Sequence, residues 1–155
     1  MTRRTRAFLD THTLTAGIWS ETGGAREVLR LGELRAIQVC VSGWVLQELD
    51  RALRRKSPTA LSWLSVLLDR CQVRIVPNPD PHALARCATL VSHPGDAAVL
   101  AAAWSAEVEY FVTLDRKHFL DQVLLHETAP FPIGTPGDFL RWFRDGLVQQ
   151  LMNHG

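Results

Sequence analysis

Two acidic residues follow short apolar segments that are predicted to form strands. Asp10 comes directly after residues 6–9, and Asp115 is separated from residues 109–113 by one leucine. Parallel strands bring their C-terminal ends to one edge of a sheet, where ligands normally bind. Aspartate is also favoured as a cap of the turn after a strand. Two aspartates at one predicted edge nevertheless favour a shared site.

Two further carboxylates are candidates for the same site. Asp96 precedes an apolar helix predicted at residues 97–104, so it can cap that helix or lie in its first turn. Glu48 lies on a helix predicted from Gly43 to about Lys56, at one border of its apolar stripe. Asp50 borders the opposite side of that stripe. Periodicity alone does not choose between Glu48 and Asp50.

The elements that must position these carboxylates alternate between short strands and helices. Strands are predicted at residues 6–9, 37–41, 73–76 and 109–113, with a possible fifth at 131–133. Helices are predicted up to residue 19 and at residues 25–34, 43–56, 58–71, 82–91, 97–104 and 136–152. This alternation is typical of βαβ units. We therefore predict an α/β fold, a three-layer α/β/α sandwich around a central parallel sheet of four to five short strands.

Composition indicates one globular domain, residues 1–155. Hydrophobic residues make up 46% of the chain and charged residues 21%, which excludes a disordered, collagen-like or disulfide-scaffold protein. The net charge is +1, so an anionic partner must be met by a local patch. Three cysteines without CxxC spacing indicate neither a zinc site nor a disulfide framework. With no signal segment and no stretch of about 18 apolar residues, we expect a soluble cytoplasmic protein that does not bind membranes.

Four segments of the chain resemble the PIN domain family in order, spacing and surroundings. These segments are residues 8–11, 46–49, 96–103 and 111–115. A fifth, residues 133–140, is similar to the closing segment of the PIN subgroup of toxins from toxin–antitoxin pairs, the VapC-like ribonucleases. The resemblance covers residues 6–140, and the four segments are specific only together.

The resemblance implies a Mg²⁺- or Mn²⁺-dependent ribonuclease with an acidic quartet of Asp10, Glu48, Asp96 and Asp115. Asp10, Asp96 and Asp115 are the expected metal ligands, and Glu48 is expected to position a water or act as a base. Hard cations prefer oxygen ligands, and a metal stabilises carboxylates that are crowded together. A metal also activates water for attack on phosphorus. We expect RNA cleavage that leaves a 5′-phosphate and a 3′-hydroxyl.

Two polar residues could support this quartet. Thr113 could hold the carboxylate of Asp115 through its hydroxyl group. His12 stands where many PIN sequences have asparagine, and an exposed turn histidine is its simplest interpretation. If His12 reaches the site, metal preference could move toward manganese and activity could depend on pH near neutrality.

Basic and aromatic residues near the quartet suggest partners. Phosphate contacts are expected from two basic clusters, which are Arg51, Arg54 and Arg55 (with Lys56) and Arg116 and Lys117 (with His118). Trp19 and Trp44 are candidates for an exposed groove. Proteins that resemble this one commonly form homodimers and are held inactive by a small antitoxin on such a surface.

Two alternative functions remain open at this point. A PIN-like module could bind RNA or protein without cleaving it. A receiver- or phosphatase-type phosphoryl-transfer domain also gathers carboxylates at strand ends around Mg²⁺. Against this second alternative, His12 and Leu9 occupy positions where such domains usually need further acidic residues.

Overall fold

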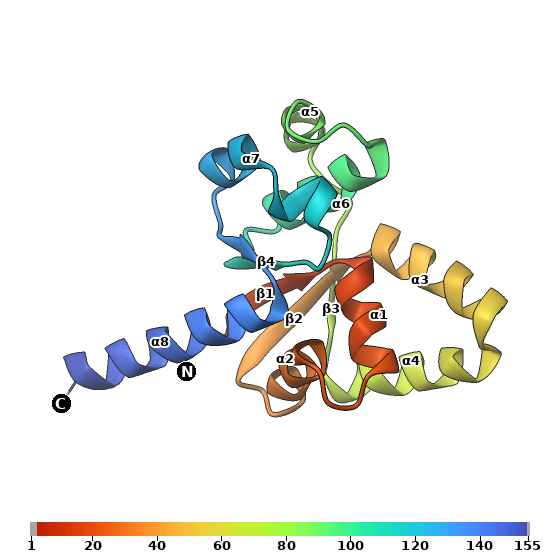
Figure 1. Ribbon diagram of the computed structural model, residues 1–155, viewed down its shortest axis with the longest axis horizontal. Coiled ribbons are helices and arrows are strands. Elements are labelled where there is room, and N and C mark those ends of the chain that lie inside the picture. Colours follow the sequence, from red (N-terminus) through yellow and green to blue (C-terminus); the bar gives the residue numbers. More distant parts are fainter. Residues whose placement is uncertain (1–2, 155) are drawn as a thin grey trace.

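A five-stranded parallel sheet forms the centre of the protein, which is described over residues 3–154 by a computed structural model (Figure 1). The strand order across the sheet is β3-β2-β1-β4-β5. The strands are β1 (Thr5–Leu9), β2 (Ile37–Ser42), β3 (Arg74–Val76), β4 (Tyr110–Val112) and β5 (Ile133–Gly134). The helices are α1 (Thr11–Trp19), α2 (Gly24–Glu33), α3 (Gly43–Lys56), α4 (Pro58–Arg70), α5 (Pro81–Ala88), α6 (Pro94–Ser105), the π-helical turn η1 (Arg116–Leu120), α7 (Val123–Thr128) and α8 (Pro136–Asn153).

Helices cover both faces of this sheet. In Figure 1, α5, α6 and α7 lie above the sheet, and α1, α2 and α4 lie below it. Helices α3 and α4 pack against each other and extend to the right. The α/β fold with a central parallel sheet between helical layers is therefore confirmed.

Strand β1 occupies the middle of the sheet, and this position creates the candidate site. It pairs in parallel with β2 on one side and with β4 on the other. Leu9, the last residue of β1, lies opposite Val112, the last residue of β4. Because both strands end at the same level, Asp10 and the residues that follow β4 lie at one edge of the sheet.

Aromatic side chains support the sheet beneath this edge. The rings of Phe8 and Phe111 are stacked, with centroids 5.4 Å apart, and Phe131 stacks on Phe111 at 6.0 Å. Phe119 lies against Phe111 at 5.0 Å in a tilted arrangement. Buried aromatic residues contribute a large apolar contact area. This packing ties η1, which carries Phe119, to the strands that carry the site.

Several boundaries differ from the predicted ones. Strand β4 is shorter at both ends than residues 109–113, and β5 comprises Ile133–Gly134 rather than residues 131–133. The shift of β5 follows from Pro132, which has no N–H to donate but whose carbonyl accepts from the N–H of Phe111 at 3.0 Å. Helix α5 ends at Ala88 rather than residue 91, because the N–H of Leu90 bonds the Cys87 carbonyl in a tighter turn.

The helix that carries Asp96 begins earlier than predicted. Helix α6 starts at Pro94 rather than at residue 97. Proline suits the first helical position, and the His93 ring accepts a hydrogen bond from the Gly95 N–H at 3.2 Å as the cap. Asp96 therefore lies inside the first turn of α6, which is one of its two predicted positions.

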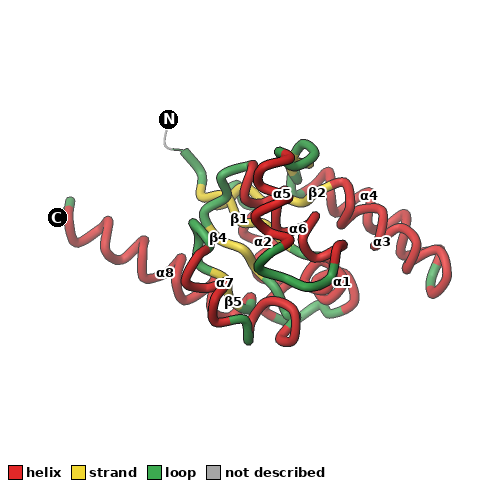
Figure 2. Tube along the Cα trace, turned by 90° about the horizontal axis from the view of Figure 1, so that it is seen from above, coloured by secondary structure: helices red, strands yellow, loops and turns green. Residues whose placement is uncertain are grey.

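The C-terminal helix α8 projects away from the rest of the protein (Figures 1 and 2). It begins with a capping box in which the Thr135 hydroxyl accepts from the Asp138 N–H and the Asp138 carboxylate accepts from the Thr135 N–H. Phe139 anchors its first turn in the core, whereas Leu151 and Met152 near its end are exposed. Among the helices of residues 3–154, none combines the length and apolar character that a membrane span requires.

Candidate active site

Asp10 is a buried carboxylate at the end of β1. It caps α1, because its Oδ1 accepts a hydrogen bond from the Thr13 N–H at 3.0 Å. Its Oδ2 accepts a second one from the Thr113 hydroxyl at 2.5 Å. With only 3% of its surface exposed, burial raises the pKa of Asp10 above its usual value, and these hydrogen bonds oppose the rise only in part.

Asp115 follows β4 and caps the short turn η1. Its Oδ1 accepts from the His118 N–H at 3.0 Å, and its Oδ2 lies 2.8 Å from Nδ1 of the same histidine. Burial acts to raise the pKa of Asp115, but the hydrogen bonds from His118 outweigh that effect and the pKa is lowered. This carboxylate is therefore held ionised beside an imidazole ring.

Asp96 faces two histidines from the first turn of α6. Its Oδ2 lies 3.7 Å from Nδ1 of His118 and 3.8 Å from Nδ1 of His93. Burial raises the pKa of Asp96, while the two histidines act in the opposite direction. The negative charge of Asp115 adds to the rise, as expected for two carboxylates that share a site.

Asp96, Asp115 and His118 form a compact group of possible metal ligands, which we call the metal cluster. One ligand atom from each lies within 4.8 Å of the others. The set fits a divalent cation, since two carboxylates and an imidazole can all bind one ion. Within residues 3–154, neither Asp10 nor Glu48 meets the same distance limit. Direct ligation by Asp10 remains a prediction.

Thr113 has a different partner from the predicted one. Its hydroxyl donates to the Asp10 carboxylate and accepts a hydrogen bond from the Asp115 backbone N–H at 3.0 Å. We had expected it to hold the carboxylate of Asp115. The side chain of Thr113 points to the neighbouring strand β1, so it links the two strand ends and fixes Asp10 relative to Asp115.

The structure separates Glu48 from Asp50 on helix α3. The Glu48 carboxylate accepts a hydrogen bond from the Thr11 hydroxyl at 3.1 Å, which places it beside the residue that follows Asp10. Asp50 instead pairs with Arg54 on the same helix, at 2.8 Å. Of the two carboxylates, only Glu48 is thus directed toward the start of α1.

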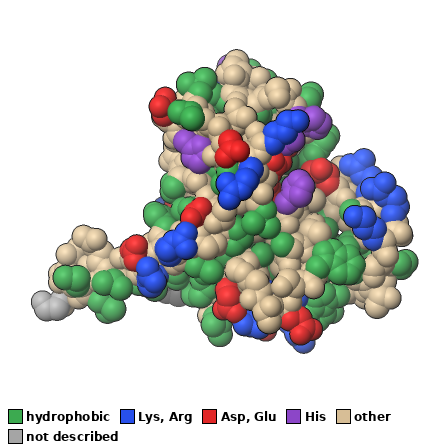
Figure 3. Space-filling view, viewed as in Figure 1, with side chains coloured by type: hydrophobic (Ala, Val, Ile, Leu, Met, Phe, Trp, Pro, Cys, Tyr) green, Lys and Arg blue, Asp and Glu red, His purple; other side chains and the backbone are tan. Residues whose placement is uncertain are grey.

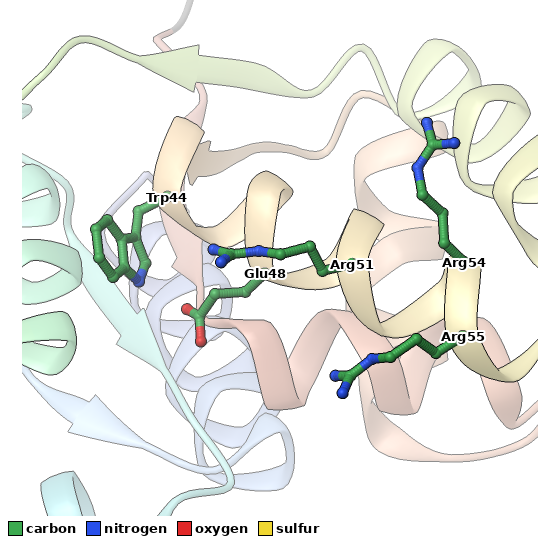
Figure 4. Close-up of a pocket in the computed structure, with 5 residues that line it drawn as sticks. All are labelled: Trp44, Glu48, Arg51, Arg54 and Arg55. Atoms are coloured by element: carbon green, nitrogen blue, oxygen red, sulfur yellow. The ribbon is translucent and has the colours of Figure 1, made fainter.

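The basic residues of α3 differ in their orientation. Together with Trp44 and Glu48, the residues Arg51, Arg54 and Arg55 line a surface concavity of about 740 Å³. Figure 4 shows Arg51 extending toward Trp44 and Glu48, whereas Arg54 points away from them. Basic side chains gather over the α3 side of the surface in Figure 3, with acidic and histidine side chains next to them.

The second basic pair and His12 lie on the solvent side of the same region. Arg116 and Lys117 are exposed on η1, directly after Asp115. His12 is exposed in the first turn of α1, as its simplest interpretation requires. A positive charge on His12 would favour the ionised form of Asp10, Asp96 and Asp115, so it lies within electrostatic reach of the site.

His118 is a member of the metal cluster that the sequence analysis does not include among the candidate ligands. Its position in the sequence places it only with the basic residues that follow Asp115. Its spacing was an available signal, because a side chain three residues after a capping aspartate lies in the first helical turn, close to the cap. His93, which also borders Asp96, precedes Pro94 and could have been expected as a helix cap on the same logic.

The sequence and fold identify the family of this protein. Residues 6–117 match the family model described as the PIN domain. Since this match covers most of the chain, the protein belongs to the PIN domain family, whose members are generally nucleases. No curated protein matches the sequence.

Two solved structures share the fold at low sequence identity. A chain of VapBC2 from Rickettsia felis, crystallised with a DNA fragment from their promoter, is 17% identical with a TM-score of 0.64, over 84% of this chain and 97% of that one. PAE2754 from Pyrobaculum aerophilum is also 17% identical, with a TM-score of 0.60 over 88% of each chain. These likenesses establish the fold and agree with the family match.

Proposed function

We propose that this protein is a divalent-metal-dependent endoribonuclease and the toxin of a bacterial toxin–antitoxin pair. One observation carries the proposal. The metal cluster lies next to the buried carboxylate of Asp10, at the C-terminal edge of the sheet in a PIN domain. A nuclease of this family needs acidic groups at that edge to bind a cation.

Asp96 and Asp115 would hold the cation. Asp10 is a third carboxylate, linked to the backbone of Asp115 through the Thr113 hydroxyl. When bound, Mg²⁺ or Mn²⁺ would lower the pKa of water and stabilise negative charge on the scissile phosphate. Thr113 and Thr13 orient Asp10 through their hydrogen bonds. These contacts hold the negative charges close together before substrate arrives.

Glu48 is our candidate for the group that accepts a proton from the attacking water. The Thr11 hydroxyl orients its carboxylate toward the start of α1, on the same side as Asp10. A general base must lie within hydrogen-bonding reach of the proton that it removes, directly or through one water. A Glu48→Gln variant should therefore retain cation binding and lose most of the cleavage rate.

The concavity on α3 offers a path for RNA into this site. Trp44 is 44% exposed, and aromatic side chains bind single-stranded RNA by stacking on its bases. Arg51 and Arg55 would contact phosphates on one side of the metal cluster, and Arg116 and Lys117 on the other. RNA would be held by these cations against an acidic site that would otherwise repel it.

The proposed partner is a small antitoxin, and the proposed assembly is a homodimer in the cytoplasm. Trp19 and Trp44 are exposed on α1 and α3, which provides apolar surface for a protein partner. The fold similarity to a chain of VapBC2 supports the antitoxin partner.

The test is cleavage of single-stranded RNA by the purified protein with Mg²⁺ or Mn²⁺. Cleavage should leave 5′-phosphates, stop on addition of EDTA and be lost in Asp115→Asn. The matched control is Asp50→Asn, the same change outside the site, which should cleave normally. Binding of RNA without cleavage under both metals would instead identify a non-catalytic module, and acid-labile phosphate on Asp10 would identify a phosphoryl-transfer domain.

A further inference from the structure

His118 places an imidazole nitrogen among the carboxylates of the metal cluster. Its Nδ1 lies 2.8 Å from Oδ2 of Asp115 and 3.7 Å from Oδ2 of Asp96. We propose that His118 is a direct metal ligand and that it makes the site prefer a first-row transition ion, such as Mn²⁺ or Co²⁺, over Mg²⁺. This inference rests on the proposed function and specifies its cofactor.

The observed distances suit shared ligation of one ion. Nitrogen and oxygen ligands lie about 2.0–2.2 Å from such ions, so two of them at right angles are separated by about 3 Å. The two distances from His118 Nδ1 to the carboxylate oxygens fall on either side of this value. In the metal-free site Nδ1 of His118 donates its proton to the Asp115 carboxylate. With that proton moved to Nε2, so that the Nδ1 lone pair faces the ion, a small adjustment of the Asp96 side chain would bring all three groups onto one cation.

The backbone already holds His118 in place. Its N–H donates to Oδ1 of Asp115 at 3.0 Å, so one turn fixes both the carboxylate and the imidazole. Phe119, the next residue, is buried against Phe111 and anchors that turn to the sheet. Only about a third of the His118 side chain is exposed. A ligand that is preorganised in this way loses little conformational freedom when the ion binds.

The other two histidines near the site are less suited to the same role. The Nδ1 atom of His93 is occupied as an acceptor for the Gly95 N–H, where it caps α6. His12 is exposed and lies outside the metal cluster. The sequence had suggested His12 as the residue that could shift metal preference. The geometry assigns that role to His118.

The nitrogen ligand determines which ion is favoured. Mg²⁺ prefers oxygen ligands and retains several of its waters, whereas imidazole binds transition ions well. Among those ions the affinity of a mixed nitrogen and oxygen site rises from Mn²⁺ to Co²⁺. The site should therefore bind Co²⁺ most tightly, Mn²⁺ next and Mg²⁺ most weakly.

Titration calorimetry with Mg²⁺, Mn²⁺ and Co²⁺, without RNA, tests this order. His118→Ala should lose roughly tenfold or more in affinity for Mn²⁺ and Co²⁺, with much less change for Mg²⁺. The matched control His82→Ala, which removes an exposed histidine of α5 outside the metal cluster, should behave like the unchanged protein. In the Co²⁺ complex, the visible absorption spectrum should change with His118→Ala and not with His82→Ala.

The outcomes separate this inference from the proposed function. An equal loss for all three ions would show that His118 only orients Asp115 and would overturn the inference alone. Unchanged affinities for Mn²⁺ and Co²⁺ in His118→Ala would overturn it as well. Failure of the unchanged protein to bind any of the three ions would overturn both proposals. If His118→Ala does not fold, His118→Gln retains a polar side chain at the same position and should show the same loss of preference.

Discussion

Two aspartates at helix starts, Asp10 and Asp138, accept similar hydrogen bonds in opposite environments. Each carboxylate accepts from a backbone N–H three residues away, Asp10 from Thr13 and Asp138 from Thr135. The side chain of Asp138 is 45% exposed and pairs with Arg141, and the backbone hydrogen bond from Thr135 is the main cause of its lowered pKa. Burial raises the pKa of Asp10 instead.

This difference shows that a hydrogen bond at a helix cap gives a net lowering of the carboxylate pKa only where the carboxylate stays hydrated. At Asp10 the lost hydration outweighs the hydrogen bonds. The negative charge there lowers the stability of the fold in the absence of a cation, whereas the charge of Asp138 raises it. A buried charge of this kind is typical of a functional site.

The largest expected effect comes from Asp10→Asn. We expect cleavage to fall by roughly 100-fold or more, the upper range for loss of a group that orients metal ligands. Without metal, the midpoint of thermal unfolding should rise, because the variant buries no charge. RNA cleavage assays and thermal unfolding in EDTA measure the two effects.

The control for this prediction is Asp138→Asn, which should lower the unfolding midpoint and leave cleavage unchanged. If both variants shifted stability in the same direction, the proposed contrast between the two aspartates would be wrong.

Some parts of the site could be predicted from the sequence and others could not. Asp10 and Asp115 follow apolar strands, and parallel strands end at one edge, so their proximity could be inferred from the sequence. The choice of Glu48 over Asp50 could not be made from periodicity, because both border the apolar stripe of α3; the resemblance to the PIN family alone selected Glu48. That choice depends on how α1 packs beside α3, which places the Thr11 hydroxyl next to Glu48.

Other features depend on contacts that periodicity does not encode. The partner of Thr113 is Asp10, directly after the neighbouring strand β1, and the ring of His118 is positioned by a π-helical turn. The alternation of strands and helices was sufficient for the layers and the parallel sheet. It did not predict that α8 projects from the rest of the protein. The sequence of α8 shows an apolar face, and this pattern is the same whether or not other elements cover that face.

The next largest effect is a difference between two arginines on α3. Arg51 extends toward Glu48, whereas Arg54 is paired with Asp50. We expect Arg51→Ala to weaken RNA binding about tenfold and to reduce its salt dependence by about one phosphate contact. Arg54→Ala should change RNA binding little.

Fluorescence anisotropy with labelled RNA at several salt concentrations measures both variants. Equal effects of the two substitutions would mean that the overall charge of α3, rather than the orientation of each arginine, determines RNA binding.

A smaller effect is expected at the capping box of α8. Thr135→Ala removes the hydroxyl that accepts from the Asp138 N–H, and loss of such a cap costs about 1 kcal/mol in the free energy of unfolding. Urea denaturation should detect this loss, and cleavage should be unaffected. Thr128→Ala serves as the control, since its exposed hydroxyl donates to the Leu124 carbonyl within α7.

The smallest effect is the pH dependence of the same contrast. The pKa of Asp138 is lowered, so its charge contributes stability above about pH 3.8, and this contribution is lost as the pH falls through the lowered value. The stability difference between the unchanged protein and Asp138→Asn should therefore shrink in acid.

The pKa of Asp10 is raised, so the native state binds its proton more tightly and stability falls as the pH rises above about 3.8. The advantage of Asp10→Asn should thus grow with pH. Urea denaturation in EDTA between pH 3 and 7 should show that, relative to the unchanged protein, Asp10→Asn gains stability and Asp138→Asn loses stability as the pH rises. Two variants that changed in the same direction would contradict the contrast.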